Sequence, residues 1–109
     1  MDLRRYSRVS FHAPCVFHAK GQSEQYAGAC QDLSLGGMFI ETATPQPFGA
    51  EVVVHVDVPG EAQPYALPGV VRWVRNGGMG VQFGLMGARE TNMITRLAAG
   101  AARKSISNE

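Results

Sequence analysis

The chain has 109 residues, 45% of them hydrophobic, which is enough for one domain with a modest buried core. Its formal net charge of +1 gives no overall field that could hold a nucleic acid polymer or a membrane surface, so any anion site must be local. No apolar run approaches the roughly 18 residues that a membrane span needs. The sequence therefore predicts a cytoplasmic protein without membrane insertion.

Three arginines lie close together at the start of the chain, Arg4, Arg5 and Arg8, beside a single acidic residue, Asp2. We expect residues 1–8 to be a flexible, arginine-rich segment that clamps a ligand. The planar guanidinium group suits bidentate contacts with phosphate or with the acceptor edge of guanine. Taken alone, such a segment is more typical of a solvated basic tail.

Residues 9–19 alternate between apolar and polar side chains, and this period of two predicts a half-buried strand. Because Pro14 has no N–H to donate, this strand is expected to lie at a sheet edge or to carry a bulge. Residues 20–25 lack large apolar side chains and predict a hairpin loop into a second strand at 26–32. The first two strands are then antiparallel.

Four more strands are predicted, at residues 38–41, 51–58, 64–75 and 79–83, the last two joined by a tight hairpin at Asn76-Gly77-Gly78. An apolar stripe of helical period then predicts a helix over about 88–103, followed by a frayed tail at 105–109. Six short strands and one late helix favour an all-β fold over residues 9–104. We expect a six-stranded antiparallel β-barrel with a C-terminal α-helix, with a β-sandwich as the alternative.

The segment between the second and third strands, Asp32-Leu33-Ser34-Leu35-Gly36-Gly37, combines an acceptor, a hydroxyl and a turn that glycine permits. In extended chain, Asp32 and Ser34 would share one face, where the carboxylate could accept from the N1 and N2 edge of guanine. Gly37 would let a ligand approach closely. The alternative is an Asx or Ser turn that satisfies its own backbone.

Other polar residues do not form a recognisable centre. His12 and His18 would lie roughly 20 Å apart on one strand, and with His55 they have no supporting thiolates or carboxylates, so no metal site is expected. Cys15 and Cys30 fit neither a redox pair nor a zinc site and are interpreted as buried thiols. No nucleophile elbow or P-loop occurs, so the sequence predicts no enzyme activity and no cofactor.

The Arg4-x-x-x-Arg8 motif before the first strand and the Asp32-x-Ser34-x-x-Gly37 motif after the second resemble, in that order, the paired signature of the PilZ domain family. Residues 80–83, Gly-Val-Gln-Phe, also look like the last strand of that family, and the resemblance extends over nearly the whole chain. It implies a six-stranded antiparallel barrel with a trailing helix. It also implies binding of cyclic di-GMP, a bacterial second messenger.

By this resemblance, the arginines would contact the phosphates and guanines of the ligand, and the turn would hold a guanine on the barrel surface. The residues assigned in this way are Arg4, Arg5, Arg8, Asp32, Ser34 and Gly37. Ordering of the flexible segment on binding would signal to a downstream protein, with the chain a monomer or a ligand-dependent dimer.

Two other functions compete with this receptor hypothesis. The first is a protein-interaction adaptor without nucleotide binding, as in some family members of pilus biogenesis or motility, which would use an exposed apolar face around Phe39, Trp73 or the helix. The second is an oligonucleotide-binding barrel, against which the near-zero net charge argues. Trp73 itself is interpreted as a partly buried anchor more readily than as a base-stacking residue.

Overall fold

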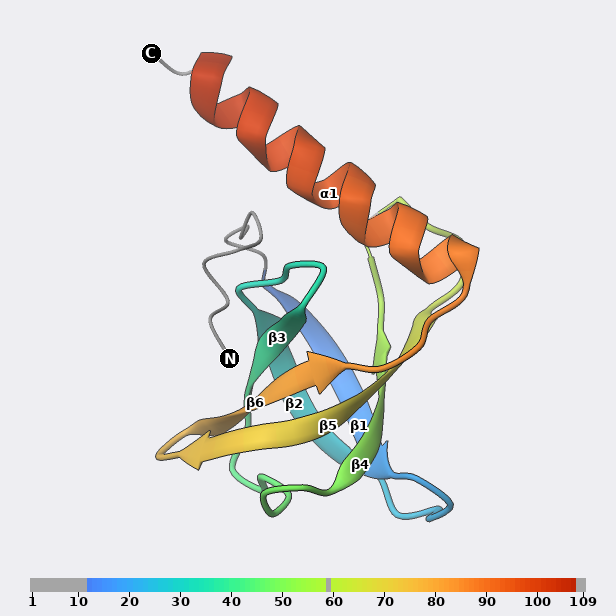
Figure 1. The fold of residues 1–109 in the computed structure, drawn as a ribbon, viewed down its shortest axis with the longest axis vertical. Coiled ribbons are helices and arrows are strands. Elements are labelled where there is room, and N and C mark those ends of the chain that lie inside the picture. The colour runs from blue at the N-terminus through green and yellow to red at the C-terminus, as the bar shows by residue number, and fades with distance from the viewer. Residues whose placement is uncertain (1–11, 59, 108–109) are drawn as a thin grey trace.

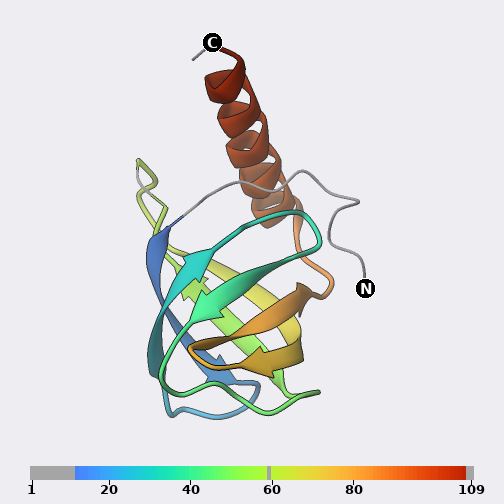
Figure 2. The same ribbon diagram turned by 90° about the vertical axis from the view of Figure 1, so that its left-hand side faces the viewer.

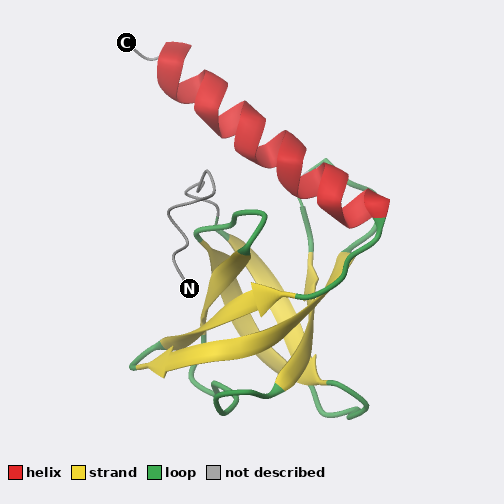
Figure 3. Cartoon of the chain, viewed as in Figure 1, coloured by secondary structure: helices red, strands yellow, loops and turns green. Residues whose placement is uncertain are grey.

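The structure is a computed structural model that describes residues 12–58 and 60–107. Figures 1 and 3 show strands curled into a barrel, followed by a long helix. The elements are β1 (Ala13–Ala19), β2 (Tyr26–Gln31), β3 (Gly37–Glu41), β4 (Glu51–Val56), β5 (Tyr65–Arg75), β6 (Gly78–Phe83) and α1 (Ala88–Ser107).

The six strands form a closed barrel in the order β1-β2-β3-β6-β5-β4, and every neighbouring pair is antiparallel. The predicted barrel is therefore confirmed and the sandwich alternative is wrong. The alternation read from the sequence gives the two faces of the wall, since Phe17, Val54 and Leu67 are fully buried while their neighbours along each strand are more exposed. Each such buried side chain contributes about 1.5–3 kcal/mol to folding.

Pro14 lies where the barrel can tolerate a missing donor. It pairs with Ala29 of β2, but the pairing of β1 with β4 begins one residue later, at Cys15 opposite Val56. Pro14 therefore has a strand neighbour on one side only, and its ring faces outward to solvent. The predicted edge position is local, because β1 as a whole is paired on both sides.

The element bounds differ modestly from those predicted. The described part of β1 begins at Ala13, and residues 9–11 of the predicted strand lie outside the described residues. The hairpin between β5 and β6 turns at Asn76 and Gly77, where Gly77 adopts a φ of 89° that favours glycine. The helix continues to Ser107, beyond its predicted end near residue 103.

The helix α1 is attached to the barrel by its first turns. Met93 and Ile94 are buried in the common core, and Leu97 packs against it. The Arg89 guanidinium lies 3.9 Å from the centroid of the Tyr65 ring, near the start of β5. Figures 1 and 2 show that α1 begins beside one end of the barrel and then extends away from it. In the described part of the chain, no helix is both long and apolar enough to cross a bilayer.

Both cysteines are buried, as the sequence predicts. Cys15 is 5% exposed, Cys30 is fully buried, and they are free thiols on adjacent strands. The Cys30 thiol lies 3.2 Å from the sulfur of Met38. Its pKa is raised by its hydrogen bond to Cys15 and by burial, whereas the pKa of Cys15 is lowered by the same hydrogen bond. These thiols are core side chains.

Candidate ligand-binding site

The turn between β2 and β3 is built around Ser34. The Ser34 N–H donates to the Gly37 carbonyl at 2.9 Å, and the Ser34 hydroxyl accepts from the Gly36 N–H at 3.2 Å. The Phe83 N–H donates to the Gly36 carbonyl at 3.0 Å, which ties the turn to the end of β6. Leu33 is buried beneath it. The turn is therefore a fixed part of the barrel wall, at the same end as the start of α1 (Figures 1 and 2).

Ser34 does not lie where extended chain would put it. Its side chain is buried, with the residue only 1% exposed, and its hydroxyl also donates to the Gly37 carbonyl at 3.4 Å. Asp32, by contrast, is exposed. The expectation that the two side chains share one face was wrong, because the chain turns between them. The Ser turn weighed as an alternative is present, with Ser34 satisfying the backbone two residues on.

Asp32 has the left-handed backbone that begins this turn. Its φ of 53° makes it the one non-glycine with positive φ among the described residues. Asp and Asn tolerate this region better than other side chains do. Asp32 is exposed and directly follows Gln31, the last residue of β2. Asp32 thus provides an acceptor at the surface while Ser34 fixes the backbone beneath it.

Gly37 is required by the close approach of two strands. A Cβ atom added there would overlap the carbonyl oxygen of Val81 in β6. Gly37 is itself buried and pairs with Gln82. The sequence predicted a glycine that lets a ligand approach, whereas the structure gives a packing reason that holds with or without a ligand.

The arginines Arg4, Arg5 and Arg8 lie outside the described residues, so their contacts remain a prediction. The register of the first two strands nevertheless fixes where their segment joins the barrel. Ala13, the first residue of β1, lies opposite Cys30, which is two residues before Asp32. The chain therefore enters the barrel beside the end of β2 from which the turn starts, as antiparallel pairing requires.

An aromatic and cationic surface lies next to the turn, and two of its residues, Phe39 and Trp73, were expected from the sequence only as part of an apolar protein-interaction face. The rings of Phe39 and Trp73 are 5.3 Å apart with planes at 16°, and the Arg75 guanidinium lies 4.8 Å from both centroids. Gly78 and Gly80 of β6 lie beneath these rings, because a Cβ at either would overlap them. We call Phe39, Trp73 and Arg75 the aromatic platform. Two glycines at alternate positions of one strand were the sequence signal for it.

Trp73 combines the two roles that the sequence left open. Its ring packs on Gly80 and Phe39, as an anchor does, yet the residue remains 37% exposed. A bulge at Arg72, between the pairs Val71 with Val81 and Trp73 with Gly80, turns Trp73 to the outer surface of the barrel. The Arg72 Nε donates to Gln82 Oε1 at 2.6 Å, so the same bulge also brings a second arginine to this surface.

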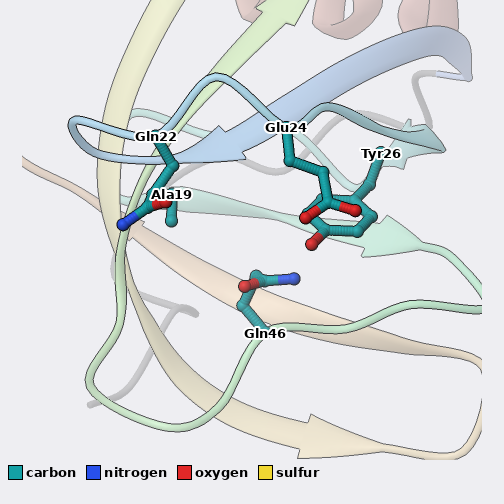
Figure 4. A pocket seen from close by; sticks show the side chains of 5 residues that line it. All are labelled: Ala19, Gln22, Glu24, Tyr26 and Gln46. Atoms are coloured by element: carbon teal, nitrogen blue, oxygen red, sulfur yellow. The ribbon is translucent and has the colours of Figure 1, made fainter.

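A hollow lies at the end of the barrel away from the turn of residues 32–37. It is lined by Ala19, Gln22, Glu24, Tyr26 and Gln46, with Tyr26 facing Glu24 (Figure 4). Its volume of about 260 Å³ is below the range of ordinary small-molecule pockets. A hydrogen bond to Glu24 raises the pKa of Tyr26. Nothing in this hollow supplies the cationic groups that an anionic ligand needs.

Among residues 12–58 and 60–107, no group of three or more His, Cys, Asp and Glu side chains could hold a metal ion. His18 and His55 do meet, with their Nε2 atoms 3.1 Å apart across the β1–β4 pair. Sequence reasoning missed this contact because 37 residues separate the two histidines. The pair provides two nitrogen atoms that could bind a metal ion, but it includes no carboxylate or thiolate.

Comparison with known proteins identifies similar domains. The family model of the PilZ domain matches residues 2–100. The PilZ domain of CeSA from a cellulose-synthesizing bacterium is 20% identical with a TM-score of 0.67, covering 85% of this chain and 95% of that one. The PilZ domain of YcgR from Escherichia coli, solved with c-di-GMP, is 17% identical with a TM-score of 0.72, covering 98% and 97%.

MrkH from K. pneumonia, solved as a c-di-GMP complex, is 17% identical with a TM-score of 0.72, and the match covers all of this chain but 56% of that one. None of the curated proteins matches the chain. At these identities, the similar structures establish the fold of the barrel.

Proposed function

Because the chain belongs to the PilZ domain family, we propose that it is a receptor for cyclic di-GMP that acts through a partner protein and catalyses no reaction. The observation that carries the proposal is the turn of residues 32–37, which carries the exposed Asp32 and is hydrogen-bonded to the end of β6. The two neighbours solved with c-di-GMP support the same ligand class. The expected compartment is the cytoplasm.

Each residue of the two motifs would have a separate task. Asp32 would accept hydrogen bonds from the N1 and N2 edge of one guanine, and Ser34 and Gly37 would hold the turn that presents it. Arg4 and Arg8, with Arg5 assisting, would form charge-assisted contacts with phosphates and guanine, each contributing about 1.5–3 kcal/mol. The register of the first described strand supports this pairing, since Ala13 lies opposite Cys30, two residues before Asp32.

The proposed output is a change in the order of the arginine-rich segment. Docking over the turn would order residues 1–8, and the entropy lost in this ordering would offset part of the binding free energy. The docked segment would then present a surface that a partner protein can recognise only in the bound state. Trypsin cleaves after arginine, so protection of Arg4, Arg5 and Arg8 from trypsin by cyclic di-GMP is the expected result for this step.

Titration calorimetry of the full chain with cyclic di-GMP tests the receptor proposal itself. We expect saturable heat with a dissociation constant in the micromolar range or below. Unlabelled ligand should compete in a parallel assay. GTP, which carries guanine and phosphates but no cyclic dinucleotide, is the matched control ligand. Absence of heat up to about 100 µM cyclic di-GMP, with folded protein, would refute the receptor function.

A second function is favoured by one specific observation. Trp73 and Val74 are 37% and 45% exposed on neighbouring positions of β5, and Trp and Arg are the residues most often found at binding hot spots. A nucleotide-independent adaptor would use such a surface. Capture of one defined partner with equal affinity in the presence and absence of cyclic di-GMP would favour the adaptor over the receptor.

A further inference from the structure

We propose that His18 and His55 form a binding site for a divalent transition-metal ion, of the class of zinc, nickel and copper, on the outer wall of the barrel. Their Nε2 atoms lie 3.1 Å apart across the pair of strands β1 and β4. The site goes beyond the proposed receptor function, since neither residue belongs to the two motifs of that function. No metal site was expected from the sequence, because nothing local brings these two histidines together.

The register of β1 and β4 places both histidines on the outer face of the wall. His18 is opposite Val53, and His55 lies two positions further along β4, so the rings approach diagonally between neighbouring strands. Phe17 and Val54, which precede the two histidines in sequence, are fully buried in the core. The histidine side chains therefore point outward, where both are half-buried and water can reach them.

The separation of the two nitrogen atoms suits a single metal ion. Zinc binds imidazole nitrogen at about 2.0–2.1 Å, and two such bonds to atoms 3.1 Å apart enclose an angle of about 100° at the metal. This angle is close to the tetrahedral arrangement that zinc adopts in proteins. The ion therefore needs a rotation of the imidazole rings and no separation of β1 from β4.

A backbone contact prepares His18 to bind a metal. Its Nδ1 lies 3.0 Å from the Ala19 carbonyl, and a hydrogen bond there puts the hydrogen on Nδ1 and leaves the Nε2 lone pair available. Histidines that bind metals almost always donate a hydrogen bond from the other ring nitrogen in this way. His55 has to move its hydrogen from Nε2 to Nδ1, which is a change of tautomer and releases no net proton.

The ligand atoms indicate the class of ion. Among residues 12–58 and 60–107, no third His, Cys, Asp or Glu side chain completes the pair, so water fills the other positions around the ion. The Glu51 carboxylate, also on β4, is paired with Lys20 at 3.4 Å. Imidazole nitrogen suits Zn²⁺, Ni²⁺ and Cu²⁺, whereas Mg²⁺ and Ca²⁺ prefer oxygen ligands. The site should therefore select the former ions.

The site is separate from the buried thiols and from the turn of residues 32–37. Cys15 is 5% exposed and belongs to the core, so its thiol lies on the opposite face of β1 from His18. In the closed order β1-β2-β3-β6-β5-β4, the β1–β4 pair lies across the ring of strands from the β3–β6 pair, beside which the turn lies. A bound ion is therefore expected to leave the affinity for cyclic di-GMP unchanged.

Titration calorimetry of the metal-free chain, without an affinity tag, with ZnCl₂ tests the proposal. We expect one saturable site with a dissociation constant of about 1–200 µM, because two protein ligands supply roughly half the binding free energy of a four-ligand zinc site. MgCl₂ at the same concentrations should give no saturable heat. Zn²⁺ should also raise the thermal unfolding midpoint, since only the folded barrel brings the two rings together.

Three variants locate the ion. His18→Gln and His55→Gln should each weaken zinc binding by about tenfold or more, since each removes one of the two protein ligands. His12→Gln, the matched control at an exposed histidine outside the pair, should bind zinc as the unaltered chain does. In nitrogen-15 NMR spectra of the unaltered chain, zinc should shift the imidazole signals of His18 and His55 and leave those of His12 in place. If one variant does not fold, these spectra and the other variant still decide the outcome.

Three results would overturn the site. The first is the absence of saturable heat up to about 1 mM ZnCl₂ with folded protein. The second is zinc binding that His18→Gln and His55→Gln both retain, and the third is an equal loss of binding in His12→Gln, which would place the ion elsewhere. Each of these results leaves the receptor function untouched, because that function is tested by a separate titration with cyclic di-GMP.

Discussion

The imidazole rings of His18 and His55 meet through their Nε2 atoms, 3.1 Å apart, across the pair of strands β1 and β4. The His18 Nδ1 lies 3.0 Å from the Ala19 carbonyl, which can only accept, so Nδ1 is the donor there. The neutral His18 Nε2 must then accept from the His55 Nε2–H, which assigns both tautomers from the hydrogen-bond network. This arrangement accommodates two neutral rings, or one extra proton on the pair, but it does not accommodate a second extra proton.

The histidine pair predicts a loss of stability in mild acid. Burial, and secondarily the proximity of His18, lowers the pKa of His55 below its ordinary value of 6.5. The unfolded chain then binds the proton more readily, so the contribution of His55 to stability is complete above about pH 6.5 and is lost as the pH falls through its folded pKa. Thermal unfolding midpoints measured between about pH 7.5 and pH 5 should show this decline.

His55→Gln should flatten that pH dependence. His12→Gln alters an exposed histidine at the start of the described chain and should leave it unchanged. Equal slopes for the unaltered chain and for His55→Gln would show that other groups cause the decline.

Asp32 is expected to be needed for binding and not for folding, provided the replacement suits its backbone. Alanine at a φ of 53° would add strain of about 1–2 kcal/mol, whereas asparagine tolerates this region. Asp32→Asn should therefore abolish tight binding of cyclic di-GMP, as Arg8→Ala should, with the unfolding midpoint of the free protein unchanged within about 2 °C. Calorimetry and a thermal scan of each variant check both halves.

The matched control for the charge change is Asp57→Asn, at an exposed position after β4. It should retain full affinity. A collapse of the unfolding midpoint in Asp32→Asn would instead assign Asp32 a structural role.

Gly37→Ala is expected to destabilise the barrel itself. The added methyl group would overlap the Val81 carbonyl, and β3 would have to move away from β6. Overpacking of this kind costs about 1–3 kcal/mol or more, which lowers the unfolding midpoint by roughly 5–20 °C. Gly21→Ala is an informative contrast, because Gly21 has open space around it and its cost comes from its φ of 80° alone. If Gly37→Ala kept its stability but failed to bind cyclic di-GMP, the interpretation that Gly37 lets the ligand approach closely would be restored.

The two cysteines are expected to be protected from alkylation in the folded protein. Cys15 is 5% exposed and Cys30 is fully buried, so neither thiol is accessible to iodoacetamide without opening of the barrel. Mass spectrometry should find both thiols unmodified in the native protein at about pH 8 and both modified in denaturant. Rapid labelling of Cys15 in the native protein would indicate that the β1–β2 pair opens readily.

Much of the fold was predictable because its signals are local. Period-two alternation identifies the inward residues of β1 and β4, such as Phe17 and Val54, and the glycines at 77 and 78 identify the hairpin of β5 and β6. The end of α1 was less predictable, because Gly100 weakens a helix by only about 1 kcal/mol and does not fix where it stops.

The candidate site was predictable as a motif but not as a geometry. Burial of Ser34 depends on the turn being tied to Phe83, a contact between residues far apart in sequence. The outward position of Trp73 depends on a bulge that no local pattern announces. Likewise, the requirement for Gly37 comes from β6, a strand that lies far from β3 in the sequence.

Closure of the barrel restricts how a partner can recognise this domain. In the described part of the chain, each of the six strands has a hydrogen-bonded neighbour on both sides, so a peptide cannot be added as a seventh strand. Recognition must therefore depend on side chains, whose arrangement a bound ligand can alter, and not on the backbone ladder, which it cannot. A closed barrel of this kind leaves a partner no free edge strand with which to pair along its whole length.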